Sequence, residues 1–158
     1  MVKFGKESVS SRRYKWLGQV PITANQEFDS WKNLSKPRFV IANNDKIFIS
    51  DLGLHKIYII DLKTGAQSAI GYLGPNPGQF RRPTGMIQDE IGNLIVCDSG
   101  NNQLQVYSRE GKYVKLATQI DNGLLSPQGL CRVNDTIYVA FKGGRIGAVV
   151  KYSLFIEC

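Results

Sequence analysis

Carboxylates and amides that follow two strand-like segments are the residues of this 158-residue chain best suited to chemistry. Asp51 ends the segment KIFISD, Asp98 ends the segment NLIVCD, and Asn101 follows three residues later. If they lined one channel, these side chains could hold a metal ion for hydrolysis. They could instead be structural, because an aspartate at a strand end can accept hydrogen bonds from N–H groups of the next turn. We favour this structural turn role for Asp51 and Asp98 and expect no metal site.

Other catalytic arrangements find little support in the sequence. His55 is the only histidine, which excludes a multi-histidine metal site, and a Ser-His-Asp triad would depend on this single loop residue. Gly143 and Gly144 are not followed by the Lys-Ser/Thr pair of a phosphate-binding loop. The sequence therefore predicts a protein that is not an enzyme, with no catalytic residue and no cofactor.

Composition indicates a single folded domain with a basic surface. Hydrophobic residues make up 42% of the chain, which is enough for a core, and the formal net charge is +7. A positive surface favours phosphate backbones or acidic protein faces, although solubility alone is an alternative explanation. No apolar segment has the length of a membrane span or of a secretory signal core, so we expect no membrane contact. Three widely spaced cysteines without a C-x-x-C motif predict a reducing, cytoplasmic location.

Three segments of the chain repeat one another from a shared proline. The prolines are Pro37, Pro83 and Pro127, which lie 46 and 44 residues apart. Each is followed by a short apolar strand, a turn rich in Asn, Asp or Gly, and two further strands rich in Ile, Val and Tyr. No segment shows the period of about 3.6 residues that is typical of a helix. The pattern predicts an all-β protein.

Strands of the repeat are apolar on both faces, as in the segments IFI, IYII and LIV. A sheet with one solvated face would alternate polar and apolar residues, whereas small sheets stacked on one another bury both faces. A β-sandwich competes with this interpretation, but a repeat of 44 to 46 residues with four strand positions favours a β-propeller. We therefore divide the single partial propeller domain, residues 1–158, into an outer strand and basic loop (13–36), blade 1 (37–82), blade 2 (83–126) and blade 3 (127–158).

The segment GQFRRPTGMIQDEIGNLIVCDSGNNQLQVYSREGKYV, residues 78–114, resembles an NHL repeat. The shared features are Gly-x-Phe, a proline with glycine two residues on, a strand that ends in aspartate, an asparagine and a closing glycine. The resemblance is partial over residues 37–65 and weak over 127–153, where Phe141 takes the aspartate position. It implies a six-bladed propeller used as a recognition platform for RNA or protein, often at the C-terminus of tripartite-motif ubiquitin ligases. The chain has too few cysteines and histidines for a RING or B-box zinc site.

Three four-stranded blades are half of the six-bladed ring that the resemblance implies. Alone, they would leave two apolar blade faces exposed, each of roughly several hundred Å². Either the chain is a fragment of a longer protein, or two copies pair as a homodimer that completes the ring. Residues 13–20, which match Tyr72-Leu73-Gly74 of the first repeat, are expected to form an outer strand. The chain would then start on an outer strand and stop near a third strand. With this offset, the first strand of each copy could complete the last blade of the other copy, which makes pairing geometrically reasonable.

Basic and amide side chains gather on one face of the predicted blades. This face is formed by the connections from strand four of one blade to strand one of the next, and from strand two to strand three within a blade. Guanidinium groups can grip phosphate, and planar amides suit single-stranded bases. We expect a non-catalytic recognition module that binds single-stranded RNA on this face. The alternative is a protein-recruiting module of a ubiquitin-ligase-like system. The predicted binding residues are Arg38, His55, Arg81, Arg82, Ser99, Asn101, Asn102, Gln128, Lys142 and Arg145.

Overall fold

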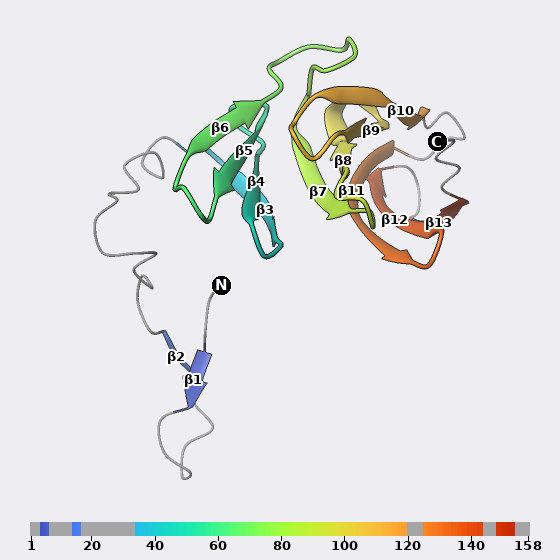
Figure 1. Cartoon of the computed structure of the whole chain (residues 1–158). Helices are drawn as coiled ribbons and strands as arrows, with labels where there is room; N and C mark the ends of the chain where they lie inside the picture. Colours follow the sequence, from blue (N-terminus) through green and yellow to red (C-terminus); the bar gives the residue numbers. More distant parts are fainter. Residues whose placement is uncertain (1–3, 7–13, 17–33, 120–124, 144–147, 154–158) are drawn as a thin grey trace.

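The parts of the chain that the computed structural model describes are residues 4–6, 14–16, 34–119, 125–143 and 148–153. This described part is all β apart from one 3₁₀ turn, η2 (Ser99–Asn101) (Figure 1). Of the predicted outer strand and basic loop, β2 (Tyr14–Trp16) pairs with β1 (Phe4–Lys6) in a two-stranded sheet, and residues 17–33 lie outside the described residues. The prediction of an all-β protein is confirmed.

The first repeat folds into a four-stranded antiparallel sheet, blade 1. Phe48 pairs with Ile59, and Ile49 pairs with Tyr58 on the next rung. Because successive side chains point to opposite faces, both faces of the sheet carry apolar groups. The strands, in chain order and in sheet order, are β3 (Pro37–Ala42), β4 (Lys46–Asp51), β5 (Lys56–Asp61) and β6 (Gln67–Ile70).

The second and third repeats fold in the same way into blades 2 and 3. The strands of blade 2 are β7 (Pro83–Gln88), β8 (Leu94–Asp98), β9 (Gln103–Tyr107) and β10 (Tyr113–Gln119). Every residue of β8 and β9 is buried, which requires cover on both faces of the sheet. In blade 3, the strands among the described residues are β11 (Leu125–Val133), β12 (Thr136–Gly143) and β13 (Ala148–Ser153).

Two apolar clusters join the three blades in series. Between blades 1 and 2 the buried members are Phe48, Ile57, Ile59, Phe80, Met86, Leu94, Val96 and Tyr107. Between blades 2 and 3 they are Ile95, Cys97, Leu104, Val106, Leu130, Ile137, Val139 and Phe141. Three sheets in series, with both faces of the middle sheet covered, distinguish this arrangement from a two-sheet sandwich.

The inner strands of blades 2 and 3 approach each other closely at Gly85. A Cβ atom on this residue would lie 2.7 Å from the carbonyl oxygen of Gln128 and 2.7 Å from the Cα of Gly129. These neighbours are backbone atoms, which cannot move aside as the end of a side chain can. The glycine two residues after Pro83 therefore admits the backbone of the next blade.

A hydrogen bond recurs at the same place in consecutive repeats and links each blade to the next. His55 Nδ1 accepts from the Arg82 N–H at 2.9 Å, and Asn102 Oδ1 accepts from the Ser126 N–H at 3.0 Å. The φ angles of these four residues are all between 55° and 57°, in the left-handed region. His55 therefore does for blade 2 what Asn102 does for blade 3, although the first repeat has no asparagine in this loop.

We expect His55→Asn to leave the free energy of unfolding nearly unchanged, because asparagine supplies the same acceptor and tolerates a positive φ. His55→Ala should lower it by about 1 kcal/mol, because the substitution removes the acceptor of the Arg82 N–H. Urea denaturation of the two variants beside the wild type measures the difference. Equal losses in both would show that the imidazole acts by packing and not as an acceptor.

Candidate functional site

The connections between strands gather at two opposite ends of the blades. In Figure 1 the β6–β7 connection, residues 71–82, arches over one end, and the β3–β4, β7–β8 and β11–β12 hairpins lie at the other. We call these the loop end and the hairpin end. The described residues of the loop end are 34–38, 51–56, 71–84, 98–103, 125–129 and 141–143.

The loop end carries basic side chains and, among its described residues, no exposed carboxylate. Its two carboxylates, Asp51 and Asp98, are each 0% exposed. Within the described part of the chain, none of its cations makes an ion pair. Five of them are exposed and Lys56 is half-buried. These six cations are Lys36, Arg38, Lys56, Arg81, Arg82 and Lys142.

Asp51 holds the loop end of blade 1 through four backbone N–H groups. Its Oδ1 accepts from Lys36 at 3.0 Å, from Gly53 at 2.8 Å and from Leu54 at 3.0 Å, and its Oδ2 accepts from Ser35 at 2.7 Å. The carboxylate thus joins the segment before β3 to the turn after β4. Burial by itself raises the pKa of Asp51, but the four N–H groups together outweigh burial and hold the pKa below its usual value.

Asp98 has the same place in blade 2 but a different set of donors. Its Oδ1 accepts from the Arg81 N–H at 2.7 Å. Its Oδ2 accepts from the side-chain amides of Asn101 at 2.7 Å, Gln103 at 2.8 Å and Gln105 at 2.9 Å. Burial raises the pKa of Asp98 above its usual value, against the lowering effect of these hydrogen bonds.

The amides around Asp98 also hold the connection 71–82 against blade 2. Asn101 Nδ2 donates to the Gly74 carbonyl at 2.8 Å, and Gln105 Nε2 donates to the Gln79 carbonyl at 2.6 Å. Gln105 Oε1 accepts from the Gly78 N–H at 3.2 Å. The side chains of β9 and η2 therefore position the backbone from which Arg81 projects.

Half of the ten predicted binding residues use their polar groups for hydrogen bonds within the protein. Ser99 is only 6% exposed, and its hydroxyl donates to the Pro127 carbonyl. Gln128 Nε2 donates to the Ser126 carbonyl at 3.2 Å. The five residues are His55, Ser99, Asn101, Asn102 and Gln128.

The predicted binding residues that are exposed are all cations. Arg81 and Arg82 lie next to each other, where the Gly100 N–H donates to the Arg81 carbonyl at 2.7 Å and His55 accepts from Arg82. Arg38 lies on β3 of blade 1, and Lys142 lies on β12 of blade 3. Arg145 lies outside the described residues. The candidate site is therefore a cationic surface that extends over three blades and is centred on Arg81 and Arg82.

Sequence reasoning missed Tyr72 as a candidate binding residue because it assigned this position to an outer strand. The outer strand β6 ends at Ile70, and Tyr72 is 60% exposed on the connection 71–82. The Phe80 N–H donates to the Tyr72 carbonyl at 2.8 Å, so Tyr72 lies close to Arg81 along the backbone. Phe80 is fully buried, with its ring centroid 5.2 Å from that of Tyr107. The sequence GPNPG after Tyr72 was the available signal, because it indicates a turn.

The hairpin end has a groove of about 540 Å³ at the boundary of blades 1 and 2. Its charges are largely paired: Lys63 lies 2.7 Å from Asp45, and Arg109 lies 3.5 Å from Glu110. Lys46 Nζ donates to the Arg109 carbonyl at 2.9 Å. A groove with paired charges of both signs attracts a polyanion less than the loop end does.

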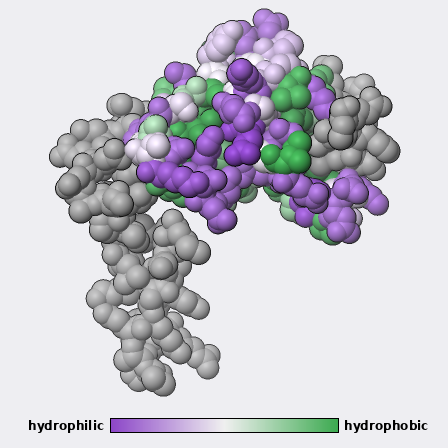
Figure 2. Space-filling model, in the orientation of Figure 1, coloured by the Kyte–Doolittle hydropathy of each residue, from purple (hydrophilic) through white to green (hydrophobic). Residues whose placement is uncertain are grey.

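Among the described residues, the side chains of Asp51, Asp98 and Cys97 are buried. Within the described part of the chain, no group of three His, Cys, Asp or Glu side chains is placed to hold a metal ion, and no helix is long and apolar enough to cross a membrane. N–H donors already point at the carboxylate oxygens of Asp51 and Asp98, and burial raises the pKa of the Cys97 thiol. Figure 2 shows hydrophilic side chains over much of the visible face, with hydrophobic patches between them.

No family model and no curated protein matches this chain. Solved structures do match it. A luciferin-regenerating enzyme matches 78% of the chain with a TM-score of 0.60 and 16% identity. A catalytically inactive virginiamycin B lyase from Staphylococcus aureus with quinupristin matches 76% with a TM-score of 0.54 and 16% identity. A streptogramin B lyase matches 73% with a TM-score of 0.52 and 15% identity.

These structural neighbours have propeller folds, and the likeness supports a propeller fold for this chain. The chain spans only 47%, 42% and 40% of the length of the three matched chains. The neighbours are enzymes, but at 15 to 16% identity the likeness concerns the fold alone. The NHL type and the six-bladed ring stay predictions.

The two buried carboxylates should give opposite pH dependences of stability. The folded-state pKa of Asp51 is lowered. Its contribution to the free energy of unfolding is therefore present above the unfolded pKa of about 3.9, and it is lost as the pH falls through the folded-state pKa. The folded-state pKa of Asp98 is raised. Its contribution to the free energy of unfolding is therefore present below the unfolded pKa, and it is lost as the pH rises through the folded-state pKa. On acidification, the stability gap between wild type and Asp51→Asn should narrow, and the gap between wild type and Asp98→Asn should widen.

Urea denaturation of the three proteins between about pH 3 and pH 7 measures both gaps. Asp51→Asn and Asp98→Asn serve as controls for each other, because each removes one buried carboxylate from the same position of a blade. Two gaps that change in the same direction with pH would contradict the assignment of opposite shifts.

Proposed function

We propose that this chain is a non-catalytic recognition module whose loop end binds single-stranded RNA. The observation that carries the proposal is the charge arrangement of the loop end. Its six cations make no ion pair within the described residues, while both of its carboxylates are buried and hydrogen-bonded. Cations without carboxylate partners attract a phosphate backbone and release its counterions on binding.

Arg81, Arg82 and Tyr72 form the centre of the proposed site. Arg81 projects from a rigid backbone, since its N–H donates to Asp98 and its carbonyl accepts from Gly100. One guanidinium group can donate two hydrogen bonds to the oxygens of one phosphate. An exposed aromatic ring such as that of Tyr72 provides a platform on which an unpaired base can stack. Because the nearby Asn101 amide is bonded to the protein, we expect recognition of backbone and base stacking more than of base edges.

A protein partner with acidic residues is the second candidate. Leu73 is 57% exposed and Leu54 is 38% exposed at the loop end, beside the cations. Apolar side chains surrounded by charges of one sign also suit a protein interface. In this alternative the chain recruits proteins in a ubiquitin-ligase-like system, as its resemblance to NHL repeats suggests. We place either activity in the cytoplasm, because the described cysteines are free.

Arg81→Glu/Arg82→Glu should weaken the binding of a fluorescent oligouridine by at least tenfold, because two phosphate contacts are lost and two negative charges are added. The slope of log affinity against log salt should become shallower by about 2. Fluorescence anisotropy at several salt concentrations measures both effects.

Arg109→Glu/Lys112→Glu is the matched control, because it makes the same change in charge at exposed positions of the hairpin end. It should bind oligouridine nearly as the wild type does. Equal weakening in both double variants would contradict a site at the loop end. A wild type that ignores oligouridine at low salt would overturn RNA binding, and capture of an acidic peptide would then favour the protein partner.

Tyr72→Ala should weaken oligouridine binding by about 5- to 100-fold, which corresponds to the loss of one stacked base. Tyr72→Phe should bind as the wild type does, because it keeps the ring. Neither change alters charge, so the salt dependence should be the same in all three proteins. Unchanged affinity in Tyr72→Ala would remove Tyr72 from the proposed site and leave the arginines to be tested on their own.

A further inference from the structure

Ile91 is exposed at the tip of a turn whose conformation is fixed. Asp89 Oδ1 accepts from the N–H groups of Ile91 at 3.1 Å and of Asn93 at 2.7 Å, and its Oδ2 accepts from the side-chain amide of Asn93 at 2.9 Å. Gly92 has a φ of 91°, which a glycine adopts without strain. Turns usually hold small or polar residues, yet Ile91 is a branched apolar side chain that is 67% exposed. The β7–β8 turn therefore presents an apolar group to the solvent in a defined position.

The groove of about 540 Å³ at the hairpin end includes this turn and has a fixed shape. The β3–β4 and β5–β6 turns of blade 1 form one side, and the β7–β8 and β9–β10 turns of blade 2 form the other. Two hydrogen bonds join the sides: Asn43 Nδ2 donates to Gln88 Oε1 at 3.0 Å, and Lys46 Nζ donates to the Arg109 carbonyl at 2.9 Å. The groove is therefore formed by the two blades together.

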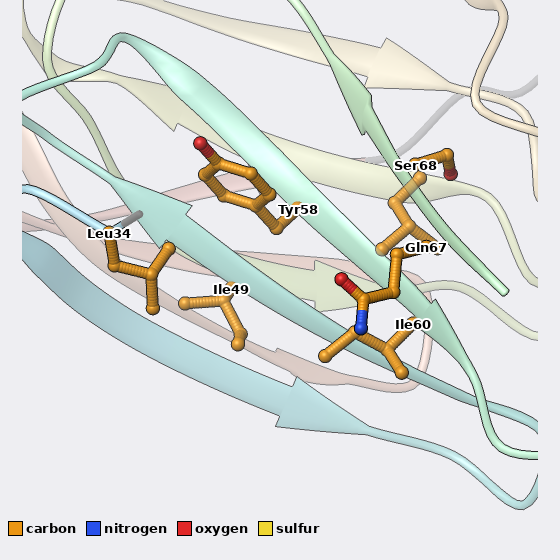
Figure 3. A pocket seen from close by; sticks show the side chains of 7 residues that line it. Leu34, Ile49, Tyr58, Ile60, Gln67 and Ser68 are labelled. Carbon is orange, nitrogen blue, oxygen red and sulfur yellow. The ribbon is translucent and has the colours of Figure 1, made fainter. Parts of the chain in front are cut away.

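The apolar face of blade 1 that points away from blade 2 is, in contrast, packed at its centre. Ile49 and Ile60 are each 4% exposed, and Leu34 and Tyr58 pack against them (Figure 3). The hollow among these side chains has a volume of about 10 Å³, which is no more than one water molecule needs. Ile91 and the groove beside it are therefore more accessible to a partner than this face.

The charges around the groove are of both signs and are exposed. Lys63 and Asp45 form one ion pair, and Arg109 and Glu110 form another. Each of these four side chains is at least 44% exposed, so water screens both pairs and the charges of a partner can replace them at little cost. Glu90 adds a side chain that is 78% exposed, next to Ile91 in the same turn. The groove thus combines an apolar group with exposed charges of both signs.

This combination favours one class of partner. A nucleic-acid backbone or an anionic membrane surface presents charge of one sign, which the carboxylates of the groove would repel. Sites for small molecules are mostly apolar, whereas seven of the twelve residues that line this groove are charged. A polypeptide segment carries apolar, basic and acidic side chains together, and its backbone N–H and C=O groups can bond to a polar lining.

We propose that the hairpin end is a second binding surface, which takes an extended segment of a protein partner. An apolar side chain of the segment packs on Ile91, and basic and acidic side chains beside it pair with the exposed charges of the groove. The loop end and the hairpin end lie at opposite ends of the blades (Figure 1), so a protein held at one leaves the other free. The proposal does not depend on what the loop end binds.

Peptides selected from a random phage-displayed library test the proposal. Selection on the Arg81→Glu/Arg82→Glu variant disfavours acidic peptides that the basic loop end would collect. Ile91→Ser should weaken the binding of a selected peptide by about tenfold or more relative to the wild type, because an apolar anchor is lost while serine is common in turns. Fluorescence anisotropy with the labelled peptide measures the affinities. Val114→Ser is the matched control: Val114 is 49% exposed on the outer strand β10, outside the groove, and this variant should bind as the wild type does.

Exchange of one ion pair tests the role of the charges. Asp45→Lys/Lys63→Asp keeps an ion pair within the protein but reverses the charges that a partner meets, so it should weaken binding of the same peptide by about two- to fivefold. Circular dichroism of each variant verifies that the sheets are retained. A selection that enriches no peptide, an affinity unchanged by Ile91→Ser or by the exchange, or an equal loss in Val114→Ser would each overturn the proposal.

A competition measurement separates the two ends of the blades. Saturation of the wild type with the selected peptide should leave its affinity for oligouridine within about twofold, because the two sites do not overlap. Displacement of oligouridine by the peptide would place both ligands at one end and overturn the second surface. A wild type that ignores oligouridine even without the peptide would contradict RNA binding alone, since the loss of peptide binding in Ile91→Ser would still identify the hairpin end.

Discussion

Burial of both faces of blade 2 is the constraint on which the rest of this structure depends. Every residue of β8 and β9 is buried, so neither face of the sheet is stable without a neighbour. Blade 1 covers one face and blade 3 covers the other, and each interface sets the register of the strands that form it. A one-residue slip would exchange the two faces, which carry different sets of side chains. The stacking of sheets in series follows from this requirement, and with it the separation of the loop end from the hairpin end.

A buried carboxylate connects this packing to the candidate site. Asp98 is fully buried, and a charge in such a place must be hydrogen-bonded. Its donors are the Arg81 N–H and three side-chain amides, and two of those amides also hold the connection 71–82. The same bonds that satisfy the carboxylate therefore present Arg81 and Tyr72 at the surface. The charged groups of the loop end are divided by sign: both carboxylates are buried, with the amides of Asn101, Gln103 and Gln105 bonded to Asp98, and five of the six cations are exposed.

This division is the basis of the proposed binding function in a chain whose propeller fold is shared with enzymes. The matched luciferin-regenerating enzyme and lyases resemble the chain at 15 to 16% identity, so they support the architecture and leave the chemistry of the site to its own residues. In this chain the carboxylates at the strand ends already accept several N–H groups each, which suits them to hold loops together. The exposed part of the same end is cationic, which suits it to recognition of an anionic partner.

Much of the fold could be predicted from the sequence, because a repeated order of proline, turn and strands that are apolar on both faces indicates small sheets stacked on one another. The repeat from Pro37, Pro83 and Pro127, the apolar cores of the strands and the aspartates at their ends all follow from local pattern. The sequence also located the basic loop end. Tertiary structure alone decided that Ser99 is buried and that Tyr72 is exposed, because both depend on which connections meet across blades. It likewise decided that His55 replaces an asparagine, since an acceptor is recognised by its partner, the Arg82 N–H, 27 residues away.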